Sequence, residues 1–532
     1  MRIDTILTNV NAVTIDAARP RAHRIGIHHG RIVGLDEELD GVRAAWVEDL
    51  DGATVVPGFN DAHNHMVLYG MSRMELDLSA MRSVEEIYAA VAERARIQPR
   101  GTWIVGSGYD QNKTGAHPHR DALDRAAPDH FVLLRHTSAH MSVVNSRALA
   151  DAGVLNGTPA PEGGVIAVDE DGRPNGLLEE QAQTLVQALR YPYPRKQIVD
   201  AIATASADYL REGITSCTEA GIGRGWIGHA PDEAAAYQEA LDAGQLRVRV
   251  QLMASGDNVH PDGLGLGLRT GFGDDRLRLG AVKIFSDGSL IGRTAAMCCD
   301  FADDPGNQGY FQAAEAGLRD RIVAAHAAGW QVATHAIGDR AIDFVLDCYQ
   351  EAQARHPRPD PRHRIEHCGV TRPDQLGRLA RLGVIPVPQA TFVGQIGDGM
   401  RAALGEDRVG WCYRHRSFLD AGLIVPGSSD RPVVRGRPLL GVHDMVNRLT
   451  ETGAQFAPQE AVDPLDALRA YTLGSAYAGF DERVKGSITP GKLADLAVLD
   501  DDPTAVAPDR IKDIEVVATM VGGEFAFGPL LR

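Results

Sequence analysis

Two histidines separated by one residue, His63 and His65, follow a short apolar run and have the spacing of a metal-binding pair. In an extended strand, side chains two positions apart lie on the same face, so both imidazoles would point the same way. Three more residues of ligand type, His335, His367 and Asp430, follow other apolar runs. Nitrogen and oxygen donors of this kind suit zinc, and manganese, iron, cobalt or nickel are alternatives.

One lysine, Lys283, lies in the middle of an apolar run between Val282 and Ile284. Burial disfavours the charged ammonium and would make this amine neutral and nucleophilic. A neutral amine beside divalent cations can take up CO₂ and become a carbamate, an anion able to bridge two metal ions. The sequence therefore supports the hypothesis of a carbamylated Lys283.

Each of these residues also has an ordinary structural interpretation. A single His-x-His pair is commonly a coincidence, which is how we interpret the adjacent His28 and His29, and a buried lysine commonly pairs with a carboxylate. Asp430 alone could cap a helix. The metal interpretation is favoured because five separate strand ends carry ligand-type residues together, which chance placement rarely produces.

The elements that must position these residues are eight apolar runs that alternate with helical patterns. The runs are residues 54–59, 214–218, 247–252, 280–285, 331–335, 364–367, 384–387 and 423–427. Such alternation is typical of parallel β/α units, and eight of them predict an α/β protein built on a (β/α)₈ TIM barrel. In that fold the catalytic residues gather at the carboxyl ends of the strands.

The two ends of the chain alternate polar and apolar residues around glycine turns, which predicts hairpins. Neither end is long enough for its own core, so we expect residues 1–56 and 483–532 to form one composite β-sandwich domain. Residues 57–482 would form the barrel. The long stretch at about 70–205 predicts a subdomain inserted after the first strand, over the barrel mouth.

Composition narrows the function classes. The chain has 532 residues, with 54 basic and 71 acidic side chains and a formal charge of −17. Such a charge argues against nucleic acid or anionic lipid as partners, and no run approaches the length of a membrane span. The N-terminus lacks the profile of a signal peptide and the six cysteines form no C-x-x-C pair, so we expect a cytoplasmic protein. A homodimer is expected only as the commonest assembly.

Several segments together resemble one known family. They are PGFNDAHNH at 57–65, VKIFSDGS at 282–289 with RTAA at 293–296, THAIGDRA at 334–341, RIEHC at 364–368, GSSDRP at 427–432 and GSITPGKLAD at 486–495. On these motifs the chain resembles, nearly end to end, the metal-dependent amidohydrolase superfamily. Within it, the chain is similar to the amidohydrolase family 3 branch that includes N-substituted formamide deformylases.

The resemblance implies a metal-dependent hydrolase that cleaves C–N bonds at a binuclear centre. The implied ligands are His63, His65 and Asp430 for the first ion, His335 and His367 for the second, and carbamylated Lys283 as the bridge. A metal-bound hydroxide would attack a small-molecule amide, formamide or N-acyl amine, and Asp430 would pass a proton to the leaving nitrogen. The expected metal is zinc.

Other residues are weaker candidates. His140, in the insertion, could reach over the mouth to hold the substrate carbonyl, and a packing role is an equally good interpretation. Residues that could line the pocket, although packing is the better interpretation for each, are Tyr109, Arg293, Gln389 and Trp411. Carboxylates that could orient the ligating rings are Asp61, Glu366 and Asp339.

Three alternatives stay open. A mononuclear deaminase on the same barrel carries His-x-x-Glu at strand five, but the third residue after His335 is Gly338. A cyclic amide could replace a linear one within the same mechanism. A metal-free, non-catalytic scaffold is disfavoured by the complete set of ligand-type residues.

Overall fold

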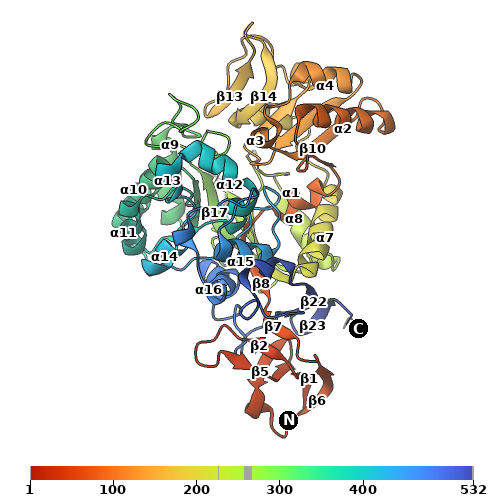
Figure 1. Cartoon of the computed structure of the whole chain (residues 1–532), viewed down its shortest axis with the longest axis vertical. Helices are drawn as coiled ribbons and strands as arrows, with labels where there is room; N and C mark the ends of the chain where they lie inside the picture. The colour runs from red at the N-terminus through yellow and green to blue at the C-terminus, as the bar shows by residue number, and fades with distance from the viewer. Residues whose placement is uncertain (1, 226, 257–266, 530–532) are drawn as a thin grey trace.

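Seven parallel strands form the central sheet of the protein (Figure 1). The computed structural model describes residues 2–225, 227–256 and 267–529. In spatial order the strands are β8 (Phe59–Asn64), β15 (Ile214–Ile222), β16 (Arg249–Ser255), β17 (Leu277–Phe285), β18 (Val332–Ala336), β19 (Arg364–His367) and β20 (Ile385–Val387). Every neighbouring pair is parallel, and spatial order follows chain order. The predicted barrel of β/α units is confirmed.

The eighth predicted run, residues 423–427, is not assigned as a strand. It lies beside β8, where the amide of Ala62 donates to the carbonyl of Gly427 at 3.0 Å. Pro426 has no N–H to donate, which explains why a continuous ladder does not form there. The barrel is therefore closed on this side by single contacts, and the sheet has seven strands where the sequence predicted eight.

Helices cover the outside of the barrel (Figure 1). They are α7 (Arg195–Arg211), α8 (Glu233–Asp242), α9 (Glu315–Ala327), α10 (Asp339–Arg355), α11 (Pro373–Leu382), α12 (Ala390–Leu404), α14 (Arg416–Asp420), α15 (Pro438–Asn447), α16 (Pro464–Arg469) and α17 (Ser475–Ala478). In α10, the apolar side chains of Ile342, Val345 and Tyr349 recur at helical spacing and are buried in the core. Within the described ranges, no helix has the length and apolar character needed to cross a bilayer.

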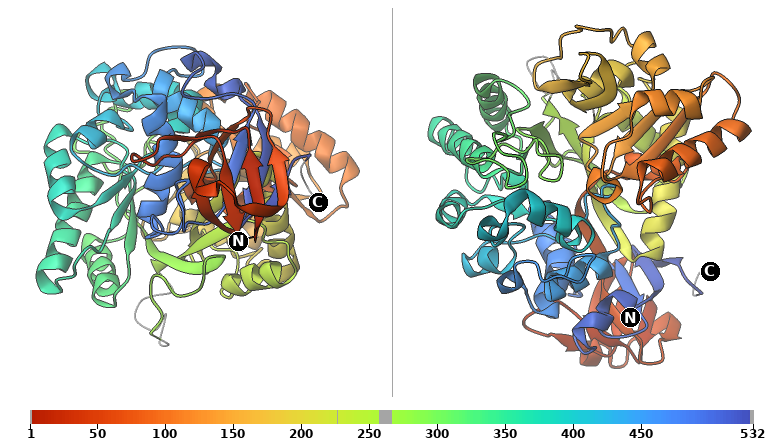
Figure 2. Two further views of the ribbon diagram at one scale, coloured as in Figure 1. Left: turned by 90° about the horizontal axis from the view of Figure 1, so that it is seen from below. Right: turned by 45° about the horizontal axis from the view of Figure 1, so that its top comes forward.

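Strands from both ends of the chain form two further sheets, with orders β5-β4-β1-β6 and β23-β22-β21-β7-β2-β3. Their bounds are β1 (Arg2–Thr8), β2 (Asn11–Val13), β3 (Arg21–Ala22), β4 (Ile25–His28), β5 (Arg31–Leu35), β6 (Arg43–Asp49), β7 (Thr54–Pro57), β21 (Leu496–Leu499), β22 (Val516–Val521) and β23 (Glu524–Phe527). Leu7 and Ile25 of one sheet share a core with Val55 and Met520 of the other. Figure 2 shows the two ends of the chain side by side. We propose that residues 1–56 and 483–532 are one domain.

The apolar run at 54–59 serves two different sheets. Pro57 pairs with β21 of the terminal sheet, whereas Phe59 pairs with β15 of the barrel. Gly58 lies between them, and a Cβ atom there would come within 2.3 Å of the Thr215 side chain. Glycine is needed for this close passage. The first barrel strand therefore starts at Phe59, later than the sequence pattern indicated.

The chain between β8 and α7 forms a six-stranded sheet of order β13-β14-β12-β11-β10-β9. Its strands are β9 (Leu76–Asp77), β10 (Trp103–Tyr109), β11 (Phe131–His136), β12 (Met141–Val144), β13 (Gly164–Val168) and β14 (Pro174–Glu180), with α2 (Val84–Ile97), α4 (Arg120–Ala126) and α5 (Ser146–Asp151). In Figure 1 this sheet lies at the opposite end of the molecule from the terminal strands. Because α7 packs against α8 and β15, we propose that the insertion ends before α7.

Candidate metal centre

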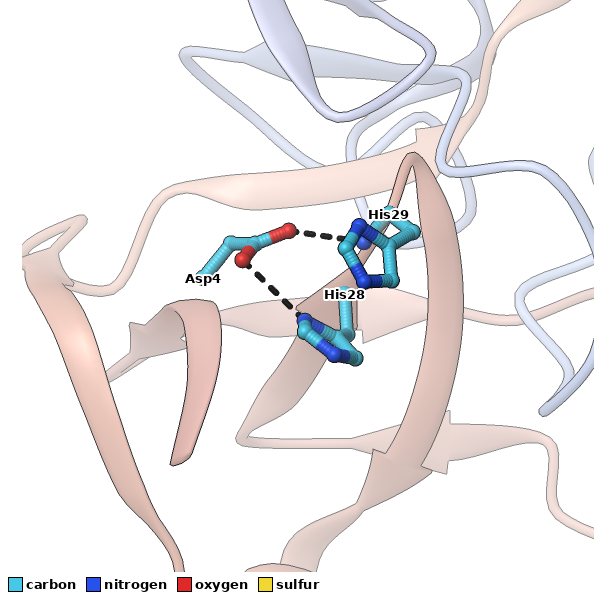
Figure 3. A group of neighbouring side chains, drawn as sticks. All are labelled: Asp4, His28 and His29. Carbon is cyan, nitrogen blue, oxygen red and sulfur yellow. Dashed lines mark hydrogen bonds and ion pairs between the residues drawn. The ribbon is translucent and has the colours of Figure 1, made fainter. Parts of the chain in front are cut away.

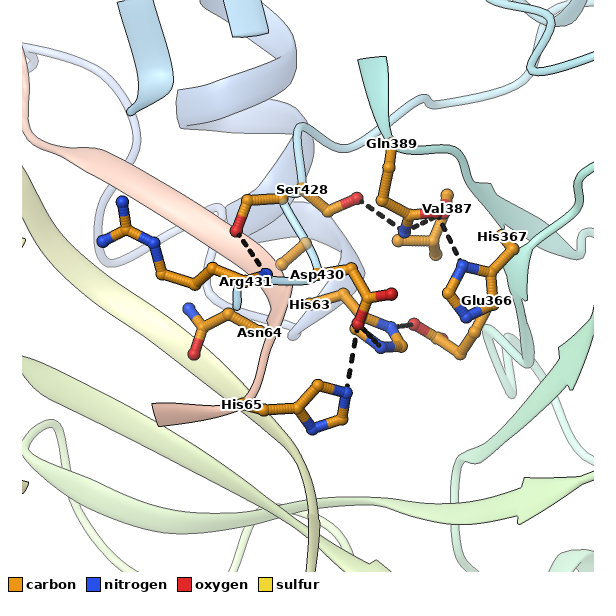
Figure 4. A network of polar contacts seen from close by, with 12 residues as sticks. His63, Asn64, His65, Glu366, His367, Val387, Gln389, Ser428, Asp430 and Arg431 are labelled. Atoms are coloured by element: carbon orange, nitrogen blue, oxygen red, sulfur yellow. Dashed lines mark hydrogen bonds and ion pairs between the residues drawn. The ribbon is translucent and has the colours of Figure 1, made fainter. Parts of the chain in front are cut away.

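Six buried side chains meet at the carboxyl ends of the barrel strands and line one cavity. They are His63 and His65 at the end of β8, Lys283 in β17, His335 in β18, His367 at the end of β19, and Asp430 after the 423–427 run. None of the six is more than 7% exposed. The structure thus brings together every ligand-type residue that the sequence singled out, and Figure 4 shows four of them.

Asp430 stands between the two histidines at the end of β8 (Figure 4). Its Oδ1 atom lies 3.2 Å from Nε2 of His63 and 3.0 Å from Nε2 of His65. Asn64, between the histidines in sequence, turns away and accepts a hydrogen bond from Tyr209. The strand alternation therefore leaves two imidazoles and one carboxylate facing one another.

The other two histidines extend the same group. The ring centroids of His335 and His367 are 4.5 Å apart, and those of His63 and His367 are 5.1 Å apart. Ligand atoms of His63, His367 and Asp430 lie within 4.8 Å of one another, close enough to surround one ion.

Hydrogen bonds fix which ring nitrogen each of these histidines offers. Nε2 of His335 donates to the carbonyl of Gly288 at 3.0 Å, so Nδ1 is left as the acceptor. Nδ1 of His367 donates to Oε1 of Gln389 at 2.7 Å, so Nε2 is left. Gln389 is anchored in turn, because its Nε2 donates to the carbonyl of Val387 at 2.8 Å. Partners of this kind set the tautomer of a metal-ligating ring.

His63 is oriented by a buried ion pair. Its Nδ1 donates to Glu366, which also accepts from Nε and Nη2 of Arg364 at 2.7 and 2.9 Å. Burial alone would raise the pKa of Glu366, but Arg364 and His63 hold that pKa below its usual range. Glu366 is therefore a carboxylate, and Nε2 of His63 is left for a metal.

Several polar atoms of the centre are buried and lack a hydrogen-bond partner among the described residues: Nζ of Lys283, Nδ1 of His335 and Nδ1 of His65. Nε2 of His63 and Oδ1 of Asp430 have only the ion-pair contacts between Asp430 and the two histidines of β8. Unpaired buried polar atoms are costly and rare, so a concentration of them indicates a missing partner. Imidazole nitrogens and a carboxylate oxygen are the donors that zinc and similar cations prefer. The residues therefore fit a metal site.

Asp430 and Glu219 raise the pKa of His65 to about 9 despite its burial, whereas for three other nitrogen groups burial dominates. Burial lowers the pKa of His367 to about 3 and holds the pKa of His335 well below its usual value. These rings are therefore neutral at pH 7, the state in which imidazole binds a metal. Burial lowers the pKa of Lys283 to about 8, and the Nζ atom lies 4.7 Å from the centroid of the Phe285 ring.

Two of the candidate ligands stand on strained backbone. His367 has φ 70° and Asp430 has φ 58°, both in the left-handed region that side chains with a Cβ atom disfavour. The amide of Asp430 donates to the carbonyl of His63 at 2.7 Å, which holds the residue in place. Such strain persists where the surroundings enforce it, and it clusters at functional sites.

His140 reaches the cavity from the turn between β11 and β12 of the insertion. Its ring centroid lies 5.0 Å from that of His335, and its Nδ1 donates to Oε2 of Glu180 at 2.7 Å. Glu180 is fully buried, has φ 48°, and accepts further hydrogen bonds from Thr294 and Gln312, each at 2.6 Å. Glu180 could not be predicted from the sequence, because nothing in its local pattern marks a buried carboxylate.

Four candidates for substrate contact are not among the described residues that line the cavity: Tyr109, Arg293, Gln389 and Trp411. The Tyr109 hydroxyl is bonded to a neighbouring histidine, and Arg293 is paired with an aspartate. Trp411 packs against a separate apolar cluster. Gln389 is behind the ligands, where it orients His367.

The carboxylates expected to orient the rings differ in their contacts. Glu366 contacts a ring, as described. Asp61 instead accepts from the amide and hydroxyl of Ser429, at 3.0 and 2.5 Å, and so anchors the turn before Asp430. Asp339 accepts from the amide of Cys298 at 2.9 Å. The sequence thus identified carboxylates near the site, but loop geometry determines which group each carboxylate contacts.

A separate group of Asp4, His28 and His29 lies in the terminal sheets (Figure 3). Oδ1 of Asp4 lies 3.0 Å from Nδ1 of His28, and Oδ2 accepts from the amide of His29 at 2.7 Å. The carboxylate thus braces the β4–β5 hairpin. This contact agrees with the structural interpretation of the two histidines.

Comparison with known proteins decides the family, because a sequence model of the amidohydrolase family matches residues 47–527. The chain belongs to this family. It is 32% identical to the N-substituted formamide deformylase of Arthrobacter pascens, over 98% of this chain and 97% of that protein. It is 31% identical to the putative amidohydrolase YtcJ of Bacillus subtilis, over 94% and 98%. An uncharacterized metal-dependent hydrolase of known structure from Pyrococcus horikoshii has a TM-score of 0.76 and 28% identity, and the match covers 95% of this chain and 99% of that one.

The amidohydrolase is therefore an enzyme that hydrolyses C–N bonds and depends on a metal. The family, the fold class and the enzyme class predicted from the sequence are confirmed. The residues described above occupy the place in the barrel where catalytic groups of this fold gather.

Proposed function

We propose that the enzyme hydrolyses a small linear amide, formamide or N-acyl amine at a binuclear zinc centre bridged by a carbamate on Lys283. The observation that carries the proposal is the convergence of buried imidazole, amine and carboxylate groups at the strand ends, with Nζ of Lys283 and Nδ1 of His335 lacking a hydrogen-bond partner among the described residues. The name of the deformylase relative, which refers to N-substituted formamides, supports an amide substrate.

The two ions would share the six side chains. His63, His65 and Asp430 would hold one ion, and His335 and His367 the other. The rings of His63, His335 and His367 would bind through the nitrogen that their hydrogen bonds leave available. Zinc is expected because it favours nitrogen and carboxylate ligands.

Lys283 would bridge the two ions. It pairs with Ala333 of the neighbouring strand, and His335 lies two residues further on, so both side chains are on the same face of the sheet. The neutral Nζ would add to CO₂ and lose one proton, which forms an N–C bond and leaves an anion with two ligand oxygens. Its unpaired Nζ atom supports this role.

The chemistry follows from these positions. When bound, divalent cations lower the pKa of coordinated water and polarise the carbonyl oxygen. Asp430 would accept a proton from the attacking water and pass it to the leaving nitrogen. Glu180 holds Nδ1 of His140, so His140 would contact the substrate amide through Nε2.

The test combines metal analysis with a substrate panel. Protein supplied with zinc and bicarbonate is expected to hold two equivalents of metal and to release amine and carboxylate from linear amides. Lys283→Met should lose the second equivalent, whereas Lys485→Met should not, because Lys485 is an equally buried lysine paired with Asp481 away from the centre. The two variants separate loss of the bridge from loss of a buried charge.

Each other outcome selects an alternative. One equivalent in the active enzyme would indicate a mononuclear centre, for which His63, His367 and Asp430 are the closest set. Turnover restricted to cyclic amides would indicate a cyclic amidase. Protein that cannot be loaded with metal would support the scaffold interpretation.

A further inference from the structure

The catalytic cavity continues from the metal centre into the insertion. Its outer part is lined by Leu133, Arg135, Arg190, Tyr193 and Ile227. The first four belong to the insertion, whereas the candidate metal ligands belong to the barrel. The outer part is therefore where a substrate would place the groups that do not react.

The charge of this lining is unusual for the chain. Among the described lining residues the one carboxylate is Asp430, at the metal end, while the outer part has two guanidinium groups, Arg135 and Arg190. The protein as a whole carries a formal charge of −17. The outer cavity is thus a cationic region in an acidic protein, and its two arginines differ in how their charge is compensated.

The positive charge of Arg135 is balanced by the carboxylate of Glu75. Its Nη1 atom lies 2.7 and 2.6 Å from the two oxygens of Glu75, and both side chains are largely buried. Glu75 also accepts from the hydroxyl of Ser107 at 2.5 Å. Arg135 therefore has a carboxylate partner within the fold. Glu75 is also near enough to Arg190 to raise the pKa of that guanidinium, although burial lowers it overall, and the two side chains form no ion pair in the described part of the chain.

Among the described residues, no carboxylate lies within ion-pair distance of Arg190. Its guanidinium lies over two aromatic rings, 5.0 Å from the centroid of Tyr193 and 5.7 Å from that of Trp103. The Nη1 atom is buried and has no hydrogen-bond partner. The aromatic rings restrict the position of the guanidinium without neutralising it. Arg190 as a whole is only partly buried, but a buried polar atom without a partner is costly, and in a substrate cavity a ligand can supply the missing anion.

We propose that Arg190 binds a carboxylate carried by the substrate, so that the enzyme acts on amide acids such as N-formyl and N-acyl amino acids. This inference rests on the proposed function for the reaction itself and adds the recognition of the substrate. A carboxylate matches the planar fork of a guanidinium, which can donate two parallel hydrogen bonds to it. The apolar side chains of Leu133 and Ile227 suit the hydrocarbon part of the same molecule.

The test uses two substrates that differ only in the carboxylate: N-formylphenylalanine and N-formyl-2-phenylethylamine. We expect the zinc-loaded enzyme to favour the acid by about 10- to 100-fold in kcat/KM, the usual effect of hydrogen bonds to a charged group. Arg190→Gln should bring that ratio close to one, mainly through the KM for the acid. N-benzylsuccinamic acid against N-benzylbutanamide places the carboxylate on the acyl side and shows which half of the amide carries it.

Arg147→Gln is the matched control. Arg147 is also an arginine of the insertion that lies over an aromatic ring, 4.5 Å from the centroid of Phe131, but it does not line the cavity. Its substitution should leave the acid-to-neutral ratio as in the wild type. Equal kcat/KM for acid and neutral amides, or a ratio unchanged by Arg190→Gln, would overturn the inference while leaving amide hydrolysis intact.

A binding experiment tests the role of Arg190 independently of the proposed hydrolysis. If no amide in either pair is hydrolysed, the proposed function fails, and the carboxylate inference is then judged by competition between hippurate and hippuramide. Calorimetry should show tighter binding of hippurate to wild-type enzyme than to Arg190→Gln. Equal binding of both compounds to both proteins would refute the role of Arg190.

Discussion

Gln389→Leu tests whether a hydrogen bond behind the metal ligands tunes the centre. Leucine keeps a similar volume but removes the acceptor for Nδ1 of His367 and the donor to the carbonyl of Val387. The hydroxyl of Ser428 loses a donor at 3.1 Å but keeps its own bond to the carbonyl of Pro388 at 3.0 Å. The largest consequence is therefore a buried imidazole N–H without a partner.

Two effects of different size follow from this change. The orphaned N–H should destabilise the metal-free protein by about 1–3 kcal/mol, the desolvation penalty of such a group. Loss of the ring's orienting partner should weaken metal binding by about 10- to 100-fold, equivalent to about 1.4–2.8 kcal/mol. Gln389→Glu should stay within about threefold of the wild type in metal affinity, because a carboxylate also accepts from His367.

The assay measures metal affinity by competition with a chromophoric chelator and the stability of the metal-free protein by urea unfolding. Gln375→Leu is the matched control. It removes a buried glutamine with three comparable bonds, to Asp339, Asp343 and the amide of Arg372, away from the centre. The control should lose stability and keep metal affinity. Wild-type metal affinity in Gln389→Leu, despite lower stability, would refute the orienting role.

Three further predictions concern the reaction and the assembly of the fold. Asp430→Asn should retain metal but lower kcat by about 10²- to 10⁴-fold, because proton transfer is lost; full turnover with metal bound would contradict the shuttle. Dialysis against a chelator should abolish hydrolysis, and zinc with bicarbonate should restore it; persistent activity in metal-free protein would contradict a metal-dependent reaction. Arg249→Met should lower the free energy of unfolding by about 3–5 kcal/mol, since it leaves the buried Asp495 without its bidentate partner at 2.7 and 2.9 Å; urea unfolding would measure this, and a loss below about 1 kcal/mol would contradict it.

The candidate ligands could be predicted from the sequence because the barrel imposes a simple rule on them. Each parallel strand ends at the same rim, so a histidine or aspartate at a strand end has a known destination. The positions of His335 and His367 could be predicted once the ends of their strands were located correctly. Asp430 follows the 423–427 run, which forms no β-ladder. It still lies at the predicted rim, because backbone hydrogen bonds fix this segment beside β8.

Apart from Glu366, which contacts a ring as expected, the groups that orient the ligands could not be predicted in the same way. The sequence favours packing over a pocket role for Gln389, but it does not show that this side chain lies behind His367, because position after a strand does not reveal the direction of a side chain in a loop. The carbonyl of Gly288, which orients His335, has no signature in any side chain. Glu180 depends on a positive φ and on contacts with two distant segments. Each of these contacts is set by loop geometry, which periodicity does not encode.

The barrel orients the candidate metal ligands, whereas the insertion supplies side chains that face the substrate cavity. Within the described part of the chain, the ring nitrogens of His63, His335 and His367 are oriented by partners that all belong to the barrel. His140 and Arg190, which face the same cavity, come from the insertion. Substitutions in the insertion should therefore change which amide is accepted while metal affinity stays constant. Weaker metal binding in Arg190→Gln would show that the two parts are coupled more tightly than these contacts indicate.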